Sequence, residues 1–140
     1  MTVSPPALPL GHFRIGKVFT IEAAHQLGGL PEQHKCGRLH GHSFTVEVTI
    51  ASTRLVGPGF VVDFAELDAL KQHLTDAFDH RLLNTVVDVE PTSENLAQQI
   101  FEWCAGNLPL PDAACVEAVR VSETATTWAE YRGPGPRDRG

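Results

Sequence analysis

Two stretches near the N-terminus alternate between apolar and polar positions. From Phe13 to His25 every second residue is mostly apolar, and from His40 to Ile50 the alternation is more regular, with Gly, Ser, Thr and Glu at the intervening positions. A period of two is typical of strands that bury one face. The pattern therefore predicts strands over residues 13–25 and 40–50, joined by a loop of residues 27–39.

The middle of the chain changes to helical spacing. Asp63 and Glu66 have the spacing of a capping box at a helix start. The apolar positions that share one face of this predicted helix are Phe64, Leu67, Leu70, Leu74 and Phe78. A second helix is predicted to begin within residues 91–94, and its inward positions are Leu96, Ile100, Phe101 and Cys104.

Two further strands are predicted over residues 114–122 and 126–132. The order of elements is then ββααββ, which indicates an α+β fold, an antiparallel sheet with two helices on one face. We expect one domain over residues 13–133. Residues 1–12 and 133–140 are rich in Pro and Gly and are predicted to be flexible ends.

The composition and net charge of the chain disfavour several classes of function. A chain of 140 residues has room for one ordinary domain, and its formal net charge of −6 disfavours nucleic-acid binding. No apolar run is long enough for a membrane span, and the N-terminus lacks the features of a secretory signal. The chain has three cysteines, a small and odd number that argues against a disulfide framework. We therefore expect a cytoplasmic protein.

Three histidines fall where the two predicted N-terminal strands meet the loop. His40 and His42 are two residues apart, so both side chains leave the apolar face, and His25 ends the apolar face of the first strand. An antiparallel hairpin would bring all three together. Core histidines bonded to backbone groups are the alternative, but three uncoordinated imidazoles would need several partners at once. The pattern predicts a metal site, with Zn²⁺ the usual occupant of a three-histidine site and an open position for chemistry.

Cys36 lies in the predicted loop, four residues before His40. It could be a fourth ligand that closes a structural zinc site, or a reactive thiol beside a catalytic one. The spacing alone favours neither interpretation.

The chain resembles the 6-pyruvoyl-tetrahydropterin synthase family, and most closely its bacterial 6-carboxy-5,6,7,8-tetrahydropterin synthase branch, which has a similarly short spacing between Cys36 and His40. The similarity runs in order from about residue 13 to residue 133. It is carried by residues 19–25 (FTIEAAH), 32–44 (EQHKCGRLHGHSF), 62–64 (VDF), 78–84 (FDHRLLN), 91–96 (PTSENL) and 121–124 (VSET).

The resemblance implies a tunnelling fold, in which subunits close into a trimeric barrel and trimers stack into a hexamer. It implies that His25, His40 and His42 bind zinc. It further implies that Cys36 is the catalytic thiol. The substrate would be 7,8-dihydroneopterin triphosphate, converted to the 6-carboxy product with loss of acetaldehyde and triphosphate in queuosine biosynthesis.

The same resemblance gives roles to four further residues, each with an alternative. Asp79 and His80 would form a proton relay, although a pair at a helix C-terminus is equally expected there. Glu123 would accept hydrogen bonds from the pterin edge, or be a solvated glutamate at a strand end. Thr92 and Ser93 have the sequence of a helix N-cap and are weaker pterin-binding candidates.

Several alternatives concern the whole chain. A 6-pyruvoyl-tetrahydropterin synthase would eliminate triphosphate and keep the side chain. A non-catalytic zinc-stabilised module would use Cys36 as its fourth ligand, and a simple zinc hydrolase would need only the three histidines. The basic residues that could neutralise a triphosphate are Lys17, Lys35, Arg38 and Arg81. Cys104 and Cys115 are expected to be small buried residues.

Overall fold

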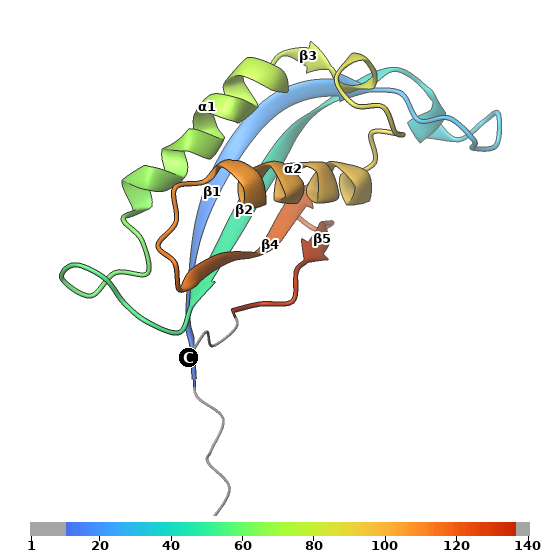
Figure 1. Ribbon diagram of the computed structural model, residues 1–140. Coiled ribbons are helices and arrows are strands. Elements are labelled where there is room, and N and C mark those ends of the chain that lie inside the picture. The colour runs from blue at the N-terminus through green and yellow to red at the C-terminus, as the bar shows by residue number, and fades with distance from the viewer. Residues whose placement is uncertain (1–10, 137–140) are drawn as a thin grey trace, which may run out of the picture.

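A five-stranded sheet forms the frame of the protein in the computed structural model, which describes residues 11–136 (Figure 1). The strand order is β3-β1-β2-β4-β5. β1 (Phe13–His25) and β2 (His40–Ser52) are antiparallel and pair without interruption from Phe13 opposite Ser52 to His25 opposite His40. The predicted N-terminal hairpin is thus confirmed, including its end at His25.

The sheet is mixed, whereas a purely antiparallel sheet was predicted. β4 (Ala114–Ser122) and β5 (Ala129–Arg132) are antiparallel additions, but β3 (Arg81–Leu82) pairs in parallel with β1. The observed order is therefore ββαβαββ. A strand of two residues contains too few positions for any periodicity, so alternation could not reveal it.

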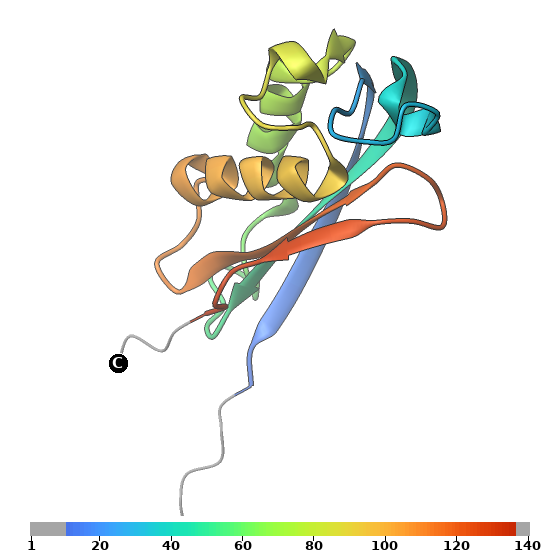
Figure 2. The same ribbon diagram turned by 90° about the vertical axis from the view of Figure 1, so that its right-hand side faces the viewer.

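Both long helices cover the same face of the sheet, as predicted (Figure 2). α1 spans Asp68–Ala77 and α2 spans Ser93–Asn107, and short 3₁₀ helices occupy Lys35–Gly37 (η1), Phe64–Leu67 (η2) and Leu83–Thr85 (η3). The core lies between this helical layer and the sheet. Its largest fully buried apolar side chains include Phe44, Ile50, Leu67, Leu70, Leu74, Leu83, Leu96 and Ile100.

The start of the first helix differs from the prediction. Asp63 does cap it, but its carboxylate accepts from the backbone N–H of Ala65 at 2.9 Å, and the first turn is the 3₁₀ helix η2. A 3₁₀ turn has three residues per turn rather than 3.6. Phe64, at the first position of η2, lies toward solvent with 52% of its surface exposed, while Leu67 is fully buried.

The remaining boundaries follow the predictions closely at α2 and less closely at β5. Thr92 caps α2 by accepting from the backbone N–H of Asn95 at 3.1 Å. β5 begins at Ala129 rather than at residue 126, because the preceding residues form a turn. Within the described residues, no helix is long and apolar enough to cross a membrane. Most of the predicted flexible ends, residues 1–10 and 137–140, lies outside the described residues.

Candidate metal centre and catalytic residues

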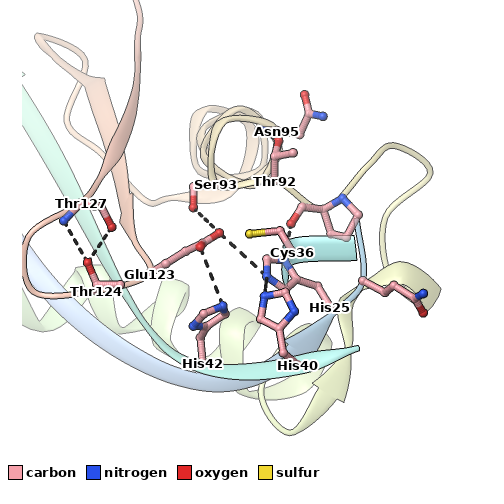
Figure 3. Close-up of polar contacts among 12 residues, drawn as sticks. His25, Cys36, His40, His42, Thr92, Ser93, Asn95, Glu123, Thr124 and Thr127 are labelled. Atoms are coloured by element: carbon pink, nitrogen blue, oxygen red, sulfur yellow. Dashed lines mark hydrogen bonds and ion pairs between the residues drawn. The ribbon is translucent and has the colours of Figure 1, made fainter. Parts of the chain in front are cut away.

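Three imidazoles converge at the loop end of the β1–β2 hairpin (Figure 3). His25 stands opposite His40 in the strand register, and His42 is two residues further along β2 on the same face. One ligand nitrogen from each of the three lies within 4.8 Å of those of the other two. The side-chain alternation predicted this grouping, and the structure confirms it.

Hydrogen bonds to backbone carbonyls fix the tautomers of two of these rings. Nδ1 of His25 is 2.7 Å from the carbonyl oxygen of Pro91, and Nδ1 of His40 is 2.6 Å from that of Arg38. A carbonyl oxygen can only accept, so both Nδ1 atoms carry the proton. With the proton of the neutral ring on Nδ1, Nε2 is the atom that bears the lone pair, and the two Nε2 atoms lie 3.0 Å apart.

Such an arrangement suits a bound cation. Two facing lone pairs repel unless a proton or a metal ion lies between them, and Nε2 of His42 is buried with no hydrogen-bond partner among the described residues. Ligating histidines commonly donate their second N–H to a carbonyl, which is the arrangement of His25 and His40. The three residues therefore fit a divalent metal with nitrogen preference.

Electrostatics favour the neutral, ligating form of His42. Burial is the main cause that lowers the pKa of His42 below its usual 6.5, and the neighbouring rings of His40 and His25 lower it further. The carboxylate of Glu123 acts in the opposite direction. A neutral imidazole keeps its lone pair available to a metal.

Glu123 lies directly beside the histidines, as the first residue after β4. Its two carboxylate oxygens are 3.9 Å from Nε2 of His25 and 3.8 Å from Nε2 of His42. The hydroxyl of Ser93 donates to Oε1 of Glu123 at 2.9 Å. Next in sequence, the hydroxyl of Thr124 accepts from two backbone N–H groups of the same turn, at 3.1 and 3.2 Å, which fixes the chain just after Glu123.

The predicted helix-cap residues thus divide between two tasks. Thr92 bonds to the backbone of α2, as an N-cap does. Ser93, which is buried, contacts the carboxylate of Glu123 across the site. The site therefore gathers groups from β1, β2, the turn after β4 and the start of α2.

Cys36 lies in η1, in the loop between the two histidine-bearing strands. Its thiol is not part of the group of donor atoms within 4.8 Å of one another, which is made of the three histidines. Figure 3 shows the sulfur pointing toward the side of the cluster where Glu123 lies. This position suits a reactive group beside a metal better than a fourth ligand.

Asp79 and His80 lie elsewhere in the chain. They follow the end of α1, where Oδ2 of Asp79 is 3.0 Å from Nδ1 of His80 and its Oδ1 accepts from the backbone N–H of Glu22 at 2.8 Å. This backbone hydrogen bond is the main cause that lowers the pKa of Asp79. His80 has a left-handed backbone (φ 58°) and a side chain that is 78% exposed.

The neighbours of His80 belong to the uncovered face of the sheet. A cavity of about 570 Å³ is lined there by Glu22, Ser43, His80 and Arg81 among others. Alternation along β1 directs Glu22 away from the face that carries His25. Within one chain, the structure therefore does not bring the predicted Asp79–His80 relay to the Cys36 side of the sheet.

Some residues that organise the site were given no role from the sequence, although several of them lie in the segments that carry the family resemblance. The carbonyl of Pro91 orients His25, the imidazole of His34 accepts from the backbone N–H of Cys36 at 3.0 Å, and Asn84 bonds to Gln26. Backbone carbonyls carry no residue-type signature, and polar loop residues have no periodicity. Among the candidate phosphate-binding residues, Lys17 is engaged with Asp68 at 2.6 Å, whereas Arg81 lines the cavity on the uncovered face.

Comparison with known proteins agrees with this geometry. Residues 14–134 match the family described as 6-pyruvoyl tetrahydropterin synthase. A relative from Synechocystis sp., named 6-carboxy-5,6,7,8-tetrahydropterin synthase, is 41% identical over 86% of this chain and 93% of its own length. A Bacillus subtilis relative of the same name is 34% identical over 86% of this chain and 85% of its own length.

A solved structure shares the fold. The 6-pyruvoyl tetrahydropterin synthase of Caenorhabditis elegans superposes with a TM-score of 0.75 and 26% identity, covering 91% of this chain and 99% of that protein. The family match spans every element of the sheet and both helices. The chain is therefore an enzyme of the 6-pyruvoyl tetrahydropterin synthase family.

Proposed function

We propose that this chain is a zinc-dependent carbon–carbon lyase. It converts 7,8-dihydroneopterin triphosphate to 6-carboxy-5,6,7,8-tetrahydropterin and releases acetaldehyde and triphosphate, a reaction that serves queuosine biosynthesis. The observation that carries the proposal is the convergence of three Nε2 atoms beside Glu123 and the Cys36 loop. The name of the relatives at 41% and 34% identity supports the choice of product.

His25, His40 and His42 would hold the zinc ion. When bound, zinc supplies a Lewis acid that polarises an oxygen of the substrate side chain and acidifies the adjacent C–H. The two carbonyl partners of His25 and His40 keep the Nε2 lone pairs directed at the metal position. Because Cys36 lies outside this donor group, a fourth position stays open to substrate.

Glu123 would anchor the pterin. The pterin edge presents parallel N–H donors, which a carboxylate accepts in bidentate fashion. Ser93 donates to one of its oxygens and so orients the carboxylate, and its hydroxyl would offer the ring a further polar contact. Thr92 would contribute through the start of α2 that it caps.

Cys36 would take the proton from the substrate side chain as its thiolate, and His80, held by Asp79, would return a proton elsewhere on the substrate. The exposed position of His80 supports a role in the site of a neighbouring copy, because its own cluster lies on the other face of the sheet. This role agrees with assembly into a trimeric barrel and a hexamer of two trimers. We place the protein in the cytoplasm, which suits its three unpaired cysteines.

The test is to incubate the zinc-loaded protein with dihydroneopterin triphosphate and identify the products by mass spectrometry. The 6-carboxy product together with acetaldehyde supports the proposal. Cys36→Ala should abolish acetaldehyde release with zinc still bound. Loss of zinc from this variant would contradict the role of Cys36 as a thiol base and make it a ligand.

The second candidate is a 6-pyruvoyl-tetrahydropterin synthase, which shares its name with the structurally similar nematode enzyme. It would eliminate triphosphate and retain the three-carbon side chain, so the mass of the product separates the two activities. A non-catalytic module closed by Cys36 is disfavoured, because Cys36 lies outside the group of converging donor atoms.

A further inference from the structure

Besides the backbone bonds within η1 itself, from Gly37 N–H to His34 and from Arg38 N–H to Lys35, three hydrogen bonds hold the turn at Cys36 and Gly37. The backbone carbonyl of Cys36 accepts from the backbone N–H of Leu27 at 3.0 Å, and the backbone N–H of Cys36 donates to Nδ1 of His34 at 3.0 Å. The side chain of Gln26 donates through Nε2 to the carbonyl of Gly37 at 3.0 Å. Two of these three bonds come from residues 26 and 27, so the position of Cys36 depends on where Gln26 lies.

The backbone of Gln26 is hydrogen-bonded by a residue from a distant part of the chain. Its backbone N–H donates to Oδ1 of Asn84 at 2.9 Å, and its carbonyl accepts from Nδ2 of Asn84 at 2.8 Å. Asn84 therefore satisfies both backbone groups of one residue with the two ends of one carboxamide. Only an amide side chain offers a donor and an acceptor in this geometry.

The place of this contact in the sheet explains why a side chain is needed. β3 pairs with β1 only at Ala23 and Ala24, and the chain then leaves the sheet as η3. β1 ends at His25, so Gln26 would be left without a strand partner. The carboxamide of Asn84 acts as a substitute peptide group that continues the pairing just beyond His25.

We infer that Asn84 is a positioning residue for the Cys36 thiol. It fixes Gln26, and Gln26 with Leu27 fixes the turn of Cys36 relative to the histidine cluster. The inference rests on the proposed function only in treating Cys36 as the reacting thiol. The chain of hydrogen bonds itself stands independently of the reaction.

A second hydrogen bond, between Gly28 and Glu90, should confine the effect of an Asn84 substitution to the turn of Cys36. The backbone N–H of Gly28 donates to the carboxylate of Glu90 at 2.9 Å, and a Cβ at Gly28 would lie only 2.7 Å from that carboxylate. This bond holds the start of the loop when Asn84 is removed. His25 is also held through its own bond to Pro91, so zinc binding should survive.

The experiment compares Asn84→Ala and Asn84→Asp with Asn107→Ala as a matched control. The carboxamide of Asn107 donates to the carbonyl of Trp103 within α2, which is a similar bond away from the site. Asn84→Asp keeps the acceptor for Gln26 N–H and loses the donor. Zinc content, hydrogen exchange of the peptide covering residues 26–39, and kcat and KM are measured for each variant.

We expect Asn84→Ala to lower kcat by about 10- to 100-fold with KM changed less than about threefold, because misplacing a reacting group by about 1 Å can cost that much. Exchange in residues 26–39 should accelerate at unchanged zinc content. The kcat and the exchange rate of Asn84→Asp should lie between those of Asn84→Ala and the wild type. Asn107→Ala should match the wild type in both quantities.

Unchanged kcat and unchanged exchange in Asn84→Ala would overturn the inference, as would a loss confined to KM or to zinc. If Asn84→Ala does not fold, the Asn84→Asp variant decides by the same measurements. If the wild type forms no 6-carboxy product, the proposed function fails, but the exchange of residues 26–39 and the alkylation rate of Cys36 still test the role of Asn84.

Discussion

At the scale of single residues, the protonation of two ring nitrogens determines what the cluster can bind. The carbonyls of Pro91 and Arg38 hold the protons on Nδ1, so the Nε2 atoms of His25 and His40 are acceptors. His42 adds a third Nε2 that is buried without a partner among the described residues. The cluster is therefore prepared for a cation before any metal binds.

Replacing one ligand should remove the metal while leaving the fold. We expect His42→Ala to weaken zinc binding by more than the roughly 10- to 100-fold that loss of an outer partner costs. His73→Ala is the matched control, since His73 lies on α1 outside the cluster. Zinc content after dialysis against a buffered chelator measures the effect. Equal zinc retention in the two variants would contradict the assignment.

Glu123 should matter for the substrate and little for the metal. We expect Glu123→Gln to raise KM by about 10- to 100-fold, because a charge-assisted hydrogen bond contributes roughly 1.5–3 kcal/mol. Ser93→Ala should give a smaller increase, because Ser93 contacts Glu123 and orients it. Steady-state kinetics and zinc analysis on the same samples separate the outcomes. Loss of zinc from Glu123→Gln would instead make Glu123 a ligand.

At the scale of elements, long periodic segments were predictable and short ones were not. Alternation over thirteen residues fixed β1, including the end at His25, because each added position repeats the same face. The two-residue strand β3 and the 3₁₀ turn η2 depend on contacts with the rest of the fold. Phe64 was predicted to share the apolar face of the first helix and is exposed.

The same division holds for the candidate site. The histidines lie on strands, so the period of two predicted their meeting. The family resemblance supplied Asp79, His80 and Glu123, and it supplied the choice of a catalytic thiol over a fourth ligand for Cys36. The hydrogen bonds that orient the histidines come from Pro91 and Arg38 in loops, where residue type does not determine position. Asn84 and Gln26 meet across 58 positions of sequence, and no local pattern records such a contact.

The helix α1 offers a test of the packing that periodicity predicted. Leu70 is fully buried between the helix and the sheet, so Leu70→Ala should lower the free energy of unfolding by about 2–5 kcal/mol. Phe64→Ala is the control, with an expected change of less than about 1 kcal/mol for an exposed side chain. Urea denaturation followed by circular dichroism measures both. A larger loss in Phe64→Ala would show that Phe64 packs against something in solution.

The contact between the two helices should make stability depend on pH. His73 of α1 stacks on Trp103 of α2 with ring centroids 4.0 Å apart and 5° between the planes. Burial, opposed by Asp76, lowers the pKa of His73 below its usual 6.5. The folded state thus binds this proton less readily than the unfolded state, so the stability contribution is complete above about pH 6.5 and declines as pH falls below it.

The corresponding experiment compares the wild type with His73→Gln, which cannot take up a proton there. Between about pH 8 and about pH 5, the wild type should lose more free energy of unfolding than the variant does. All other histidines are common to both proteins, so their contributions cancel in the comparison. An identical pH dependence would mean that His73 titrates alike in the folded and unfolded states.

At the scale of the whole molecule, a single chain leaves much of its sheet without a partner. Among the described residues, β1 pairs on its outer side only at Ala23 and Ala24, and β5 pairs only with β4. The helices cover one face, and the other carries Val18 with 54% of its surface exposed. Unpaired edges and an uncovered face favour association with further copies.

Association would also explain where the Asp79–His80 pair acts. The pair lies beside Glu22 on the uncovered face, whereas Cys36 lies in the loop between the strands that bear the histidines. If His80 serves the site of a neighbouring copy, two different inactive chains should repair each other. A mixed oligomer of Cys36→Ala and His80→Ala chains contains some sites with an intact Cys36 from one chain and an intact His80 from the next.

Co-expression of the two variants with different affinity tags tests this arrangement. Each variant alone should be inactive, and random mixing in equal amounts should restore about one quarter of the wild-type activity, because each intact contribution is present with a chance of about one half. Two differently tagged Cys36→Ala chains are the control and should stay inactive. If mixed oligomers that purify through both tags recover no activity, then either His80 acts in the site that contains Cys36 of its own chain, or His80 takes no part in the reaction.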